Sequence, residues 1–228
     1  PSLPYVAQVR AEVGPDCLII VRWFEAHQGL DAPALNAAQW FGAHLPQLQA
    51  LAAFKPLAVE GYNEIPDHQA AAYCEFEIAR LKALHGIGLH SVVGNFSVGT
   101  PDLPVWQTYQ PMLDAMRPGD WLGLHEYFVD RADLSNPWHV GRWRLVPELD
   151  GVPIVVTECG RDVAEGRGHA GWKGQVSENE YLDELREYGR LLDQFPNVLG
   201  ATVFTGGRIY PQWKDFNVND IWPRVVAG

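Results

Sequence analysis

Two glutamates stand where a carboxylate could take part in catalysis, each at the end of a short apolar run. Glu64 follows the run that begins at Leu57, and Glu158 ends the run that begins at Pro153. A loop and then a helix-type pattern follow each of them, which predicts strand–loop–helix units. In such units the C-terminal ends of parallel strands meet on one face, where catalytic residues are placed. Two carboxylates there are the minimum needed to cleave a glycosidic bond.

Three further polar residues accompany the two glutamates. Asn63 precedes Glu64, and His125 and Tyr127 end the predicted strand before Glu158. Cleavage with retention needs one carboxyl group to protonate the leaving oxygen and a second, about 5 Å away, to attack the anomeric carbon. We expect Glu64 to be the acid and then the base, with its pKa raised by apolar surroundings. Glu158 is expected to be the nucleophile, kept ionised by a hydrogen bond from Tyr127.

The remaining polar residues and the cysteine of these predicted strands are expected to bind the sugar or to support the fold. Asn63 is expected to hold the sugar 2-hydroxyl, and His125 to orient the acid or to contact the sugar. Glu126 alternates away from its two neighbours and is expected on the outer face of the strand. Glu60 is expected to pair with a basic residue, and Cys159 to be a small buried thiol, although a Cys–His pair stays open.

Tryptophan is abundant, with nine residues in the chain. Four of them lie in predicted loops after strands, where a flat ring could be a platform for a sugar or could simply cover the fold: Trp138, Trp143, Trp172 and Trp213. The predicted loops over 129–152 and 160–176 hold three of the four. Loops of this length in a compact domain are usually functional.

Six strand-like runs predict the framework that positions these residues. They are Cys17–Phe24, Leu57–Tyr62, His90–Phe96, Trp121–Phe128, Ile154–Glu158 and Leu199–Thr205. Several are nearly continuous apolar stretches, which is the pattern of a parallel strand covered on both faces.

Helix-type patterns separate these runs and complete the alternation. They cover residues 34–53 with an interruption at Pro46, a stretch capped by Asp67 and stopped by Gly86, a stretch from Pro104, and a stretch opened by the capping box of Ser177 and Glu180. Strand and helix in alternation predict a parallel sheet with helices outside. A doubly wound sheet is the alternative, but no glycine-rich phosphate loop follows the first strand.

The Asn63–Glu64 pair, the His125-x-Tyr127 pattern and the strand-end Glu158 occur in an order similar to that of the clan A glycoside hydrolases. These are the (β/α)8 retaining group that includes cellulase-like enzymes, and the chain resembles them from about residue 17 to the C-terminus. The resemblance implies that Glu64 is the acid/base at the end of the fourth strand, that Glu158 is the nucleophile at the end of the seventh, and that no cofactor is needed. Trp213 resembles the tryptophan that often floors the sugar site.

Counted on that template, the six predicted strands are the third to the eighth, so the first two βα units are absent. Residues 1–16 are too few to supply them, because each unit needs roughly 30 residues. The chain is therefore expected to be a fragment, a shortened (β/α)8 barrel, or a barrel that another chain or segment closes. The absent part normally contributes a site arginine, for which Arg22 is a possible substitute.

Composition limits the remaining classes of function. The chain has 228 residues, 47% of them hydrophobic, so one domain over residues 1–228 is expected. A net charge of −11 argues against a nucleic-acid partner. No apolar run is long enough to span a membrane, and no signal peptide or metal-ligand spacing such as H-E-x-x-H is present. Three dispersed cysteines imply neither a disulfide framework nor a metal site, and the compartment stays open.

The sequence thus predicts a retaining glycoside hydrolase that cleaves β-linked oligo- or polysaccharides by double displacement. Two alternatives stay open. A non-catalytic carbohydrate-binding or scaffold module could keep the site residues without turnover, and a lyase or isomerase could use the same carboxylates for proton transfer.

Overall fold

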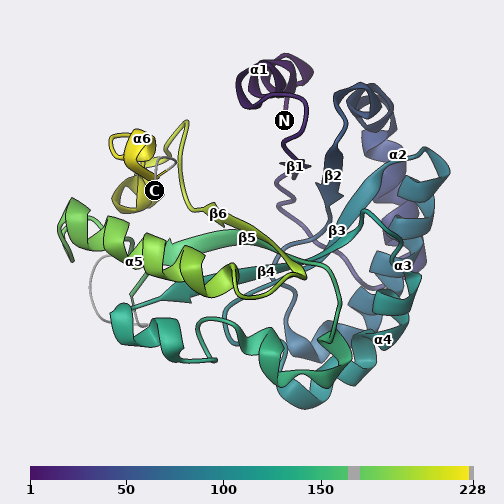
Figure 1. The fold of residues 1–228 in the computed structure, drawn as a ribbon. Coiled ribbons are helices and arrows are strands. Elements are labelled where there is room, and N and C mark those ends of the chain that lie inside the picture. The colour runs from purple at the N-terminus through teal and green to yellow at the C-terminus, as the bar shows by residue number, and fades with distance from the viewer. Residues whose placement is uncertain (164–169, 226–228) are drawn as a thin grey trace. The chain divides into compact units, whose positions relative to one another are not determined.

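The computed structural model describes residues 1–163 and 170–225, within which six strands form one sheet in the order β1-β2-β3-β4-β5-β6 (Figure 1). The strands are β1 (Ile19–Val21), β2 (Leu57–Glu60), β3 (His90–Phe96), β4 (Trp121–Phe128), β5 (Ile154–Arg161) and β6 (Val198–Val203). The helices are α1 (Leu3–Val13), α2 (Pro33–Leu51), α3 (Ala70–Gly86), α4 (Trp106–Ala115), α5 (Glu178–Leu192) and α6 (Trp222–Val225). The predicted strand–helix alternation is confirmed, except that short 3-10 helices take the place of an α-helix between β4 and β5.

The chain divides into two compact units. Unit 1 comprises Pro1–Phe96 and Thr100–Gly123, and unit 2 comprises Ser97–Gly99 and the described part of Leu124–Gly228. The boundary falls within β4, and each unit is described by itself below. The expectation of a single domain over residues 1–228 stays a prediction.

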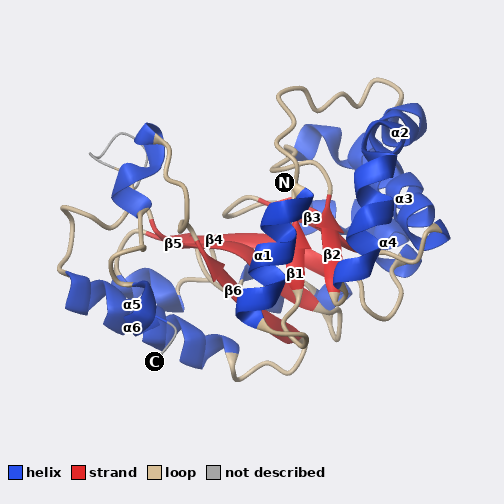
Figure 2. Ribbon diagram, turned by 90° about the horizontal axis from the view of Figure 1, so that it is seen from above, coloured by secondary structure: helices blue, strands red, loops and turns tan. Residues whose placement is uncertain are grey.

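Unit 1 contains three parallel strands with helices packed beside them. Ile19 pairs with Leu57 between β1 and β2, and Ala58 pairs with His90 between β2 and β3. Every residue of β2 is buried: Leu57, Ala58 and Val59 as their apolar run predicts, and Glu60 beside Arg22. Helices α2, α3 and α4 lie in succession on one side of β2 and β3 (Figure 2).

A buried ion pair joins α3 to the strands of unit 1. The Arg80 Nη2 donates to Glu77 Oε2 at 2.6 Å, and both side chains are fully buried. Burial raises the pKa of the Glu77 carboxyl, and the Arg80 charge partly opposes this rise. The same guanidinium donates to the carbonyl oxygens of Val59 at 3.0 Å and Val92 at 2.9 Å. Arg80 therefore fastens α3 to both β2 and β3.

Unit 2 is built on the pairing of β5 with β6 and on the apolar face of α5. Ile154 pairs with Val198, and Cys159 pairs with Val203, with the two strands parallel. The core cluster joins β5 residues such as Val156 to α5 residues such as Leu182. The capping box predicted for Ser177 and Glu180 is confirmed at the start of α5.

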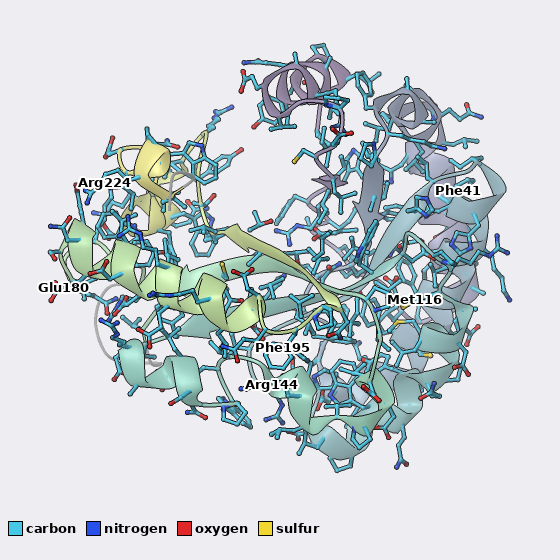
Figure 3. The ribbon with its side chains drawn as sticks, viewed as in Figure 1. Phe41, Met116, Arg144, Glu180, Phe195 and Arg224 are labelled. Carbon is cyan, nitrogen blue, oxygen red and sulfur yellow. The ribbon has the colours of Figure 1, made fainter. Side chains whose placement is uncertain are left out.

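Cationic side chains cover parts of the surface of unit 2. Figure 3 labels Arg144 beside Phe195, and the guanidinium carbon lies 5.6 Å from the ring centroid. Arg224 of α6 donates to Glu178 at 3.4 Å and to Asn179 at 2.5 Å, which ties α6 to the first turn of α5.

Several predicted boundaries differ from the observed ones. β1 ends at Val21 rather than Phe24, whose side chain is 91% exposed, and β5 continues past Glu158 to Arg161. Asp67 does not cap α3; its carboxylate accepts the N–H of Asp102 at 2.8 Å, and a 3-10 turn precedes the helix. The first residues form α1, which no sequence pattern predicted. Of the predicted loop 160–176, residues 164–169 lie outside the described residues.

Candidate active site

Glu64 lies in the loop that follows β2 and adopts an unusual backbone conformation. Its φ is 54°, in the left-handed region that costs an ordinary residue roughly 1–2 kcal/mol. Its N–H donates to the carbonyl oxygen of Asn95 at 3.0 Å, at the end of β3, where Asn95 itself has a φ of 47°. Glu64 is exposed, which differs from the apolar surroundings that the sequence suggested.

Asn63 is held by two side chains from the segment after β1. The Arg22 Nη1 donates to Asn63 Oδ1 at 2.6 Å, and the Arg22 Nε lies 3.6 Å from Glu60 Oε2. The side-chain amide of Gln28 bonds to the backbone of Asn63. The predicted ion pair of Glu60 with a basic residue is confirmed, and Arg22 contacts the residue next to Glu64. Because Asn63 Oδ1 accepts this hydrogen bond from Arg22, the side-chain NH2 group of Asn63 points away from Arg22 and can donate to another acceptor.

Glu158 lies within β5 and is contacted by the two β4 side chains that the sequence singled out. The Tyr127 hydroxyl donates to Glu158 Oε2 at 2.9 Å, which confirms the predicted hydrogen bond. The His125 Nδ1 lies 3.8 Å from the same oxygen, and its side chain is fully buried. Strand alternation explains the arrangement, because residues two apart point to the same face.

Glu126 points to the opposite face of β4, as predicted. Its carboxylate accepts the N–H of Gly141 at 2.6 Å and the hydroxyl of Tyr188 at 2.6 Å. Burial raises the pKa of Glu126, and these two hydrogen bonds oppose the rise. Glu126 therefore joins β4 to α5 and takes no part in the group around Glu158.

An aromatic cluster packs against the ring of Tyr127. Phe204, after β6, and Phe216 both meet it nearly edge-on, with centroids 6.3 and 6.2 Å away and interplanar angles of 77° and 78°. Trp213 meets Phe204 at 5.3 Å and Phe216 at 5.8 Å, and its side chain is 39% exposed. Trp213 thus reaches the surface from a cluster that touches the Glu158 group.

The loop tryptophans divide into exposed and buried ones. Trp138 is 50% exposed, with the Arg142 guanidinium 4.5 Å from its ring centroid. Trp172 is buried and stacks on Tyr181 at 5.0 Å with an interplanar angle of 10°, so the expectation that it is a sugar platform is wrong. At 4% exposure, the Trp172 ring has no open face to offer a sugar. Trp143 is buried as well, edge-on to Phe195.

Cys159 is a buried thiol, as expected. Burial raises the pKa of this thiol, as is typical of a structural cysteine. Within residues 1–163 and 170–225, no group of three or more His, Cys, Asp or Glu side chains is arranged to hold a metal ion. No helix of the same residues has the length and apolarity needed to cross a membrane.

The structure thus assembles the predicted residues into two groups. Arg22 and Asn63 accompany Glu64 in unit 1, whereas His125, Tyr127 and, through the aromatic cluster, Trp213 accompany Glu158 in unit 2. Three residues were missed by sequence reasoning: Gln28, Asn95 and Phe216. Only Asn95 had a local signal, because Asn after Gly at a strand end favours left-handed backbone.

Several solved structures are similar to this chain. The endo-β-1,4-glucanase Xac0029 from Xanthomonas axonopodis pv. citri gives a TM-score of 0.60 at 14% identity, over 94% of this chain and 70% of that one. PbGH5A, a glycoside hydrolase family 5 enzyme from Prevotella bryantii B14, gives 0.58 at 13% identity, over 90% and 70%. XacCel5A, solved in complex with cellopentaose, gives 0.57 at 12% identity, over 88% and 66%.

The fold is that of the cellulase-like glycoside hydrolases. It is an incomplete (β/α)8 fold, since the described residues supply six strands where a complete one has eight. The chain spans about two thirds of the length of the solved structures that it matches, 66% and 70% in these cases. No family model matches the sequence, and no curated protein matches it either. At 12–14% identity, the similarity concerns the cellulase-like fold alone.

Proposed function

We propose that this protein is a retaining glycoside hydrolase that cleaves β-linked oligo- or polysaccharides. The observation that carries the proposal is the group around Glu158: a strand carboxylate that accepts a hydrogen bond from Tyr127 at 2.9 Å, beside His125, in a cellulase-like fold. Glu64, next to an anchored Asn63 at the end of β2, supplies the second carboxyl group.

The proposed mechanism is double displacement. Glu64 gives its proton to the glycosidic oxygen while a Glu158 oxygen attacks the anomeric carbon, so the carbon–oxygen bond to the leaving group breaks as the glycosyl–enzyme ester forms. Glu64, now ionised, takes a proton from water, and the water oxygen displaces Glu158. The Tyr127 hydroxyl donates to Oε2 of Glu158 and so orients the attacking carboxylate. The Asn63 NH2 group donates to the sugar 2-hydroxyl.

The names of the structural neighbours support a β-linked glucan or mannan as the class of substrate. They include an endo-β-1,4-glucanase, a mannanase catalytic domain from Streptomyces sp. SirexAA-E and an enzyme that binds cellopentaose. Trp213 and Trp138 are the exposed loop rings on which pyranose faces would stack. We retain both as proposed platforms and exclude Trp172.

The decisive experiment is to incubate the protein with a panel of activated 2-fluoro glycosides and to map the labelled residue by mass spectrometry. A covalent glycosyl adduct on Glu158 is expected, since the 2-fluoro group slows both formation and breakdown of the ester, and the activated leaving group restores formation alone. The Glu158→Gln variant should remain unlabelled. The Glu64→Gln variant should still be labelled, because a good leaving group departs without a proton. Full hydrolysis by Glu158→Gln would refute the assignment.

Completion of the barrel is part of the proposal. We propose that further βα structure, from the same protein or from another chain, joins this one when the site is active, consistent with the 66–70% coverage of the solved structures. The alternative of a non-catalytic carbohydrate-binding module gains no support from the comparisons. Sugar binding without any adduct on Glu158 would nevertheless favour it over hydrolysis.

A further inference from the structure

The loop between β1 and α2 fastens the backbone next to Glu64 through a single side chain. Gln28 Nε2 donates to the carbonyl oxygen of Asn63 at 2.9 Å, and the N–H of Asn63 donates to Gln28 Oε1. One side-chain amide thus satisfies both backbone polar groups of one residue, much as a residue of a neighbouring strand would. We call these two hydrogen bonds the Gln28 clamp.

The clamp acts on the peptide plane that leads into Glu64. The carbonyl of Asn63 and the N–H of Glu64 belong to one planar unit. Gln28 holds the carbonyl oxygen, while Asn95 accepts the N–H at 3.0 Å. With its acceptor and its donor fixed by two different segments, this plane cannot turn freely. The φ of 54° at Glu64 is measured from the same plane.

The neighbouring peptide is held as well. The buried Tyr73 hydroxyl lies 2.9 Å from the carbonyl oxygen of Tyr62 and 2.8 Å from that of Gly94. Burial raises the pKa of Tyr73, so this hydroxyl stays protonated and donates. The loop before Glu64 is therefore fixed on the α3 and β3 side without Gln28. Among the described residues, the backbone of Asn63 is held from the β1–α2 loop by the Gln28 clamp alone.

We infer that Gln28 is a positioning residue for Glu64. Together with Asn95, it keeps the backbone of Glu64 in the left-handed conformation and so sets the direction in which the Glu64 side chain points. A residue with a Cβ stays at such a φ only while its surroundings impose it. Loss of the clamp lets the peptide plane turn and redirects the Cα–Cβ bond of Glu64. The inference rests on the proposed function only in calling that carboxyl group the catalytic acid.

The first test measures amide hydrogen exchange by NMR in Gln28→Leu, which removes both hydrogen bonds at similar side-chain size. The amides of Asn63 and Glu64 are expected to exchange about tenfold faster or more, as for the loss of one net hydrogen bond. Val59 and Ser91 should keep their rates. Gln39→Leu, the same change on an exposed residue of α2, is the matched control and should alter none of them. Faster exchange at Asn63 with an unchanged Glu64 would overturn the inference.

The second test separates positioning from support of the fold. Across aryl glycosides of graded leaving-group ability, Gln28→Leu should lower kcat/KM by about 10- to 100-fold for poor leaving groups and hardly at all for activated ones. Equal losses for every substrate would show that Gln28 merely supports the fold, and would overturn the inference. If no variant hydrolyses any substrate while the exchange effect persists, the proposed function fails and the clamp stands.

Discussion

At the scale of single residues, the Glu158 group shows how a carboxylate can be held by both hydrogen bonds and ring packing. Tyr127 supplies the hydrogen bond at 2.9 Å, and its own ring packs nearly edge-on against Phe204 and Phe216. A tyrosine ring packed in this way loses less rotational freedom when its hydroxyl binds the carboxylate. The aromatic cluster therefore belongs to the site even though Phe216 is buried away from solvent.

Removal of the Tyr127 hydroxyl tests this arrangement. A hydrogen bond to a charged group contributes about 1.5–3 kcal/mol, so Tyr127→Phe should slow labelling of Glu158 by about 10- to 100-fold. Tyr5→Phe, which removes an exposed hydroxyl on α1, is the control and should leave the rate unchanged. Phe216→Leu should cause a smaller loss that vanishes in the Tyr127→Phe background, because it acts through that hydroxyl. Additive losses would contradict this role for Phe216.

At the scale of elements, the turn after β2 depends on close approach of a helix. A Cβ on Gly61 would lie 2.4 Å from Glu77 Oε1 and 2.5 Å from Arg80 Nε, atoms of the buried ion pair. Because glycine has no Cβ, the Glu77–Arg80 ion pair of α3 can pack directly against the backbone at the end of β2. The loop that carries Asn63 and Glu64 begins at this point, so the packing of α3 sets where the loop starts.

Two glycine substitutions in unit 1 should have opposite effects. Gly61→Ala is expected to lower the free energy of unfolding by about 1–3 kcal/mol, because the buried ion pair has no room to move away. Gly42→Ala, in α2 with nothing within 4 Å of the added carbon, should raise it by about 0.5–1 kcal/mol through helix propensity. Urea titrations followed by circular dichroism measure both. A neutral Gly61→Ala would contradict the steric account.

At the scale of the whole molecule, the open question is whether the two units unfold together. A single domain over residues 1–228 predicts one cooperative transition. In native-state hydrogen exchange, Gly61→Ala should then lower the protection of core amides in unit 2, such as Val156, by as much as that of core amides in unit 1, such as Val59. An effect confined to unit 1 would show that the units are independent, and the single-domain prediction would fail.

The sequence alone determined the features that depend on local pattern. Runs rich in apolar and aromatic residues, each bounded by turn residues, placed the strands, with β3 and β4 predicted to the residue. Strand alternation put His125 and Tyr127 on one face and Glu126 on the other, since side chains alternate with a period of two. The capping box at Ser177 is equally local.

Only the tertiary structure decided which distant groups meet. Trp172 stacks on Tyr181 in the core, although its loop position suggested a sugar platform. Gln28 contacts Asn63, 35 residues away in the sequence, and Arg80 contacts Val59, 21 residues away. No periodic pattern in the sequence predicts either contact. Such contacts depend on how buried elements pack, which a one-dimensional pattern does not contain. The candidate catalytic residues and their strand neighbours His125 and Tyr127 could be predicted from the sequence, whereas Gln28 and Phe216, which reach them from distant segments, could not.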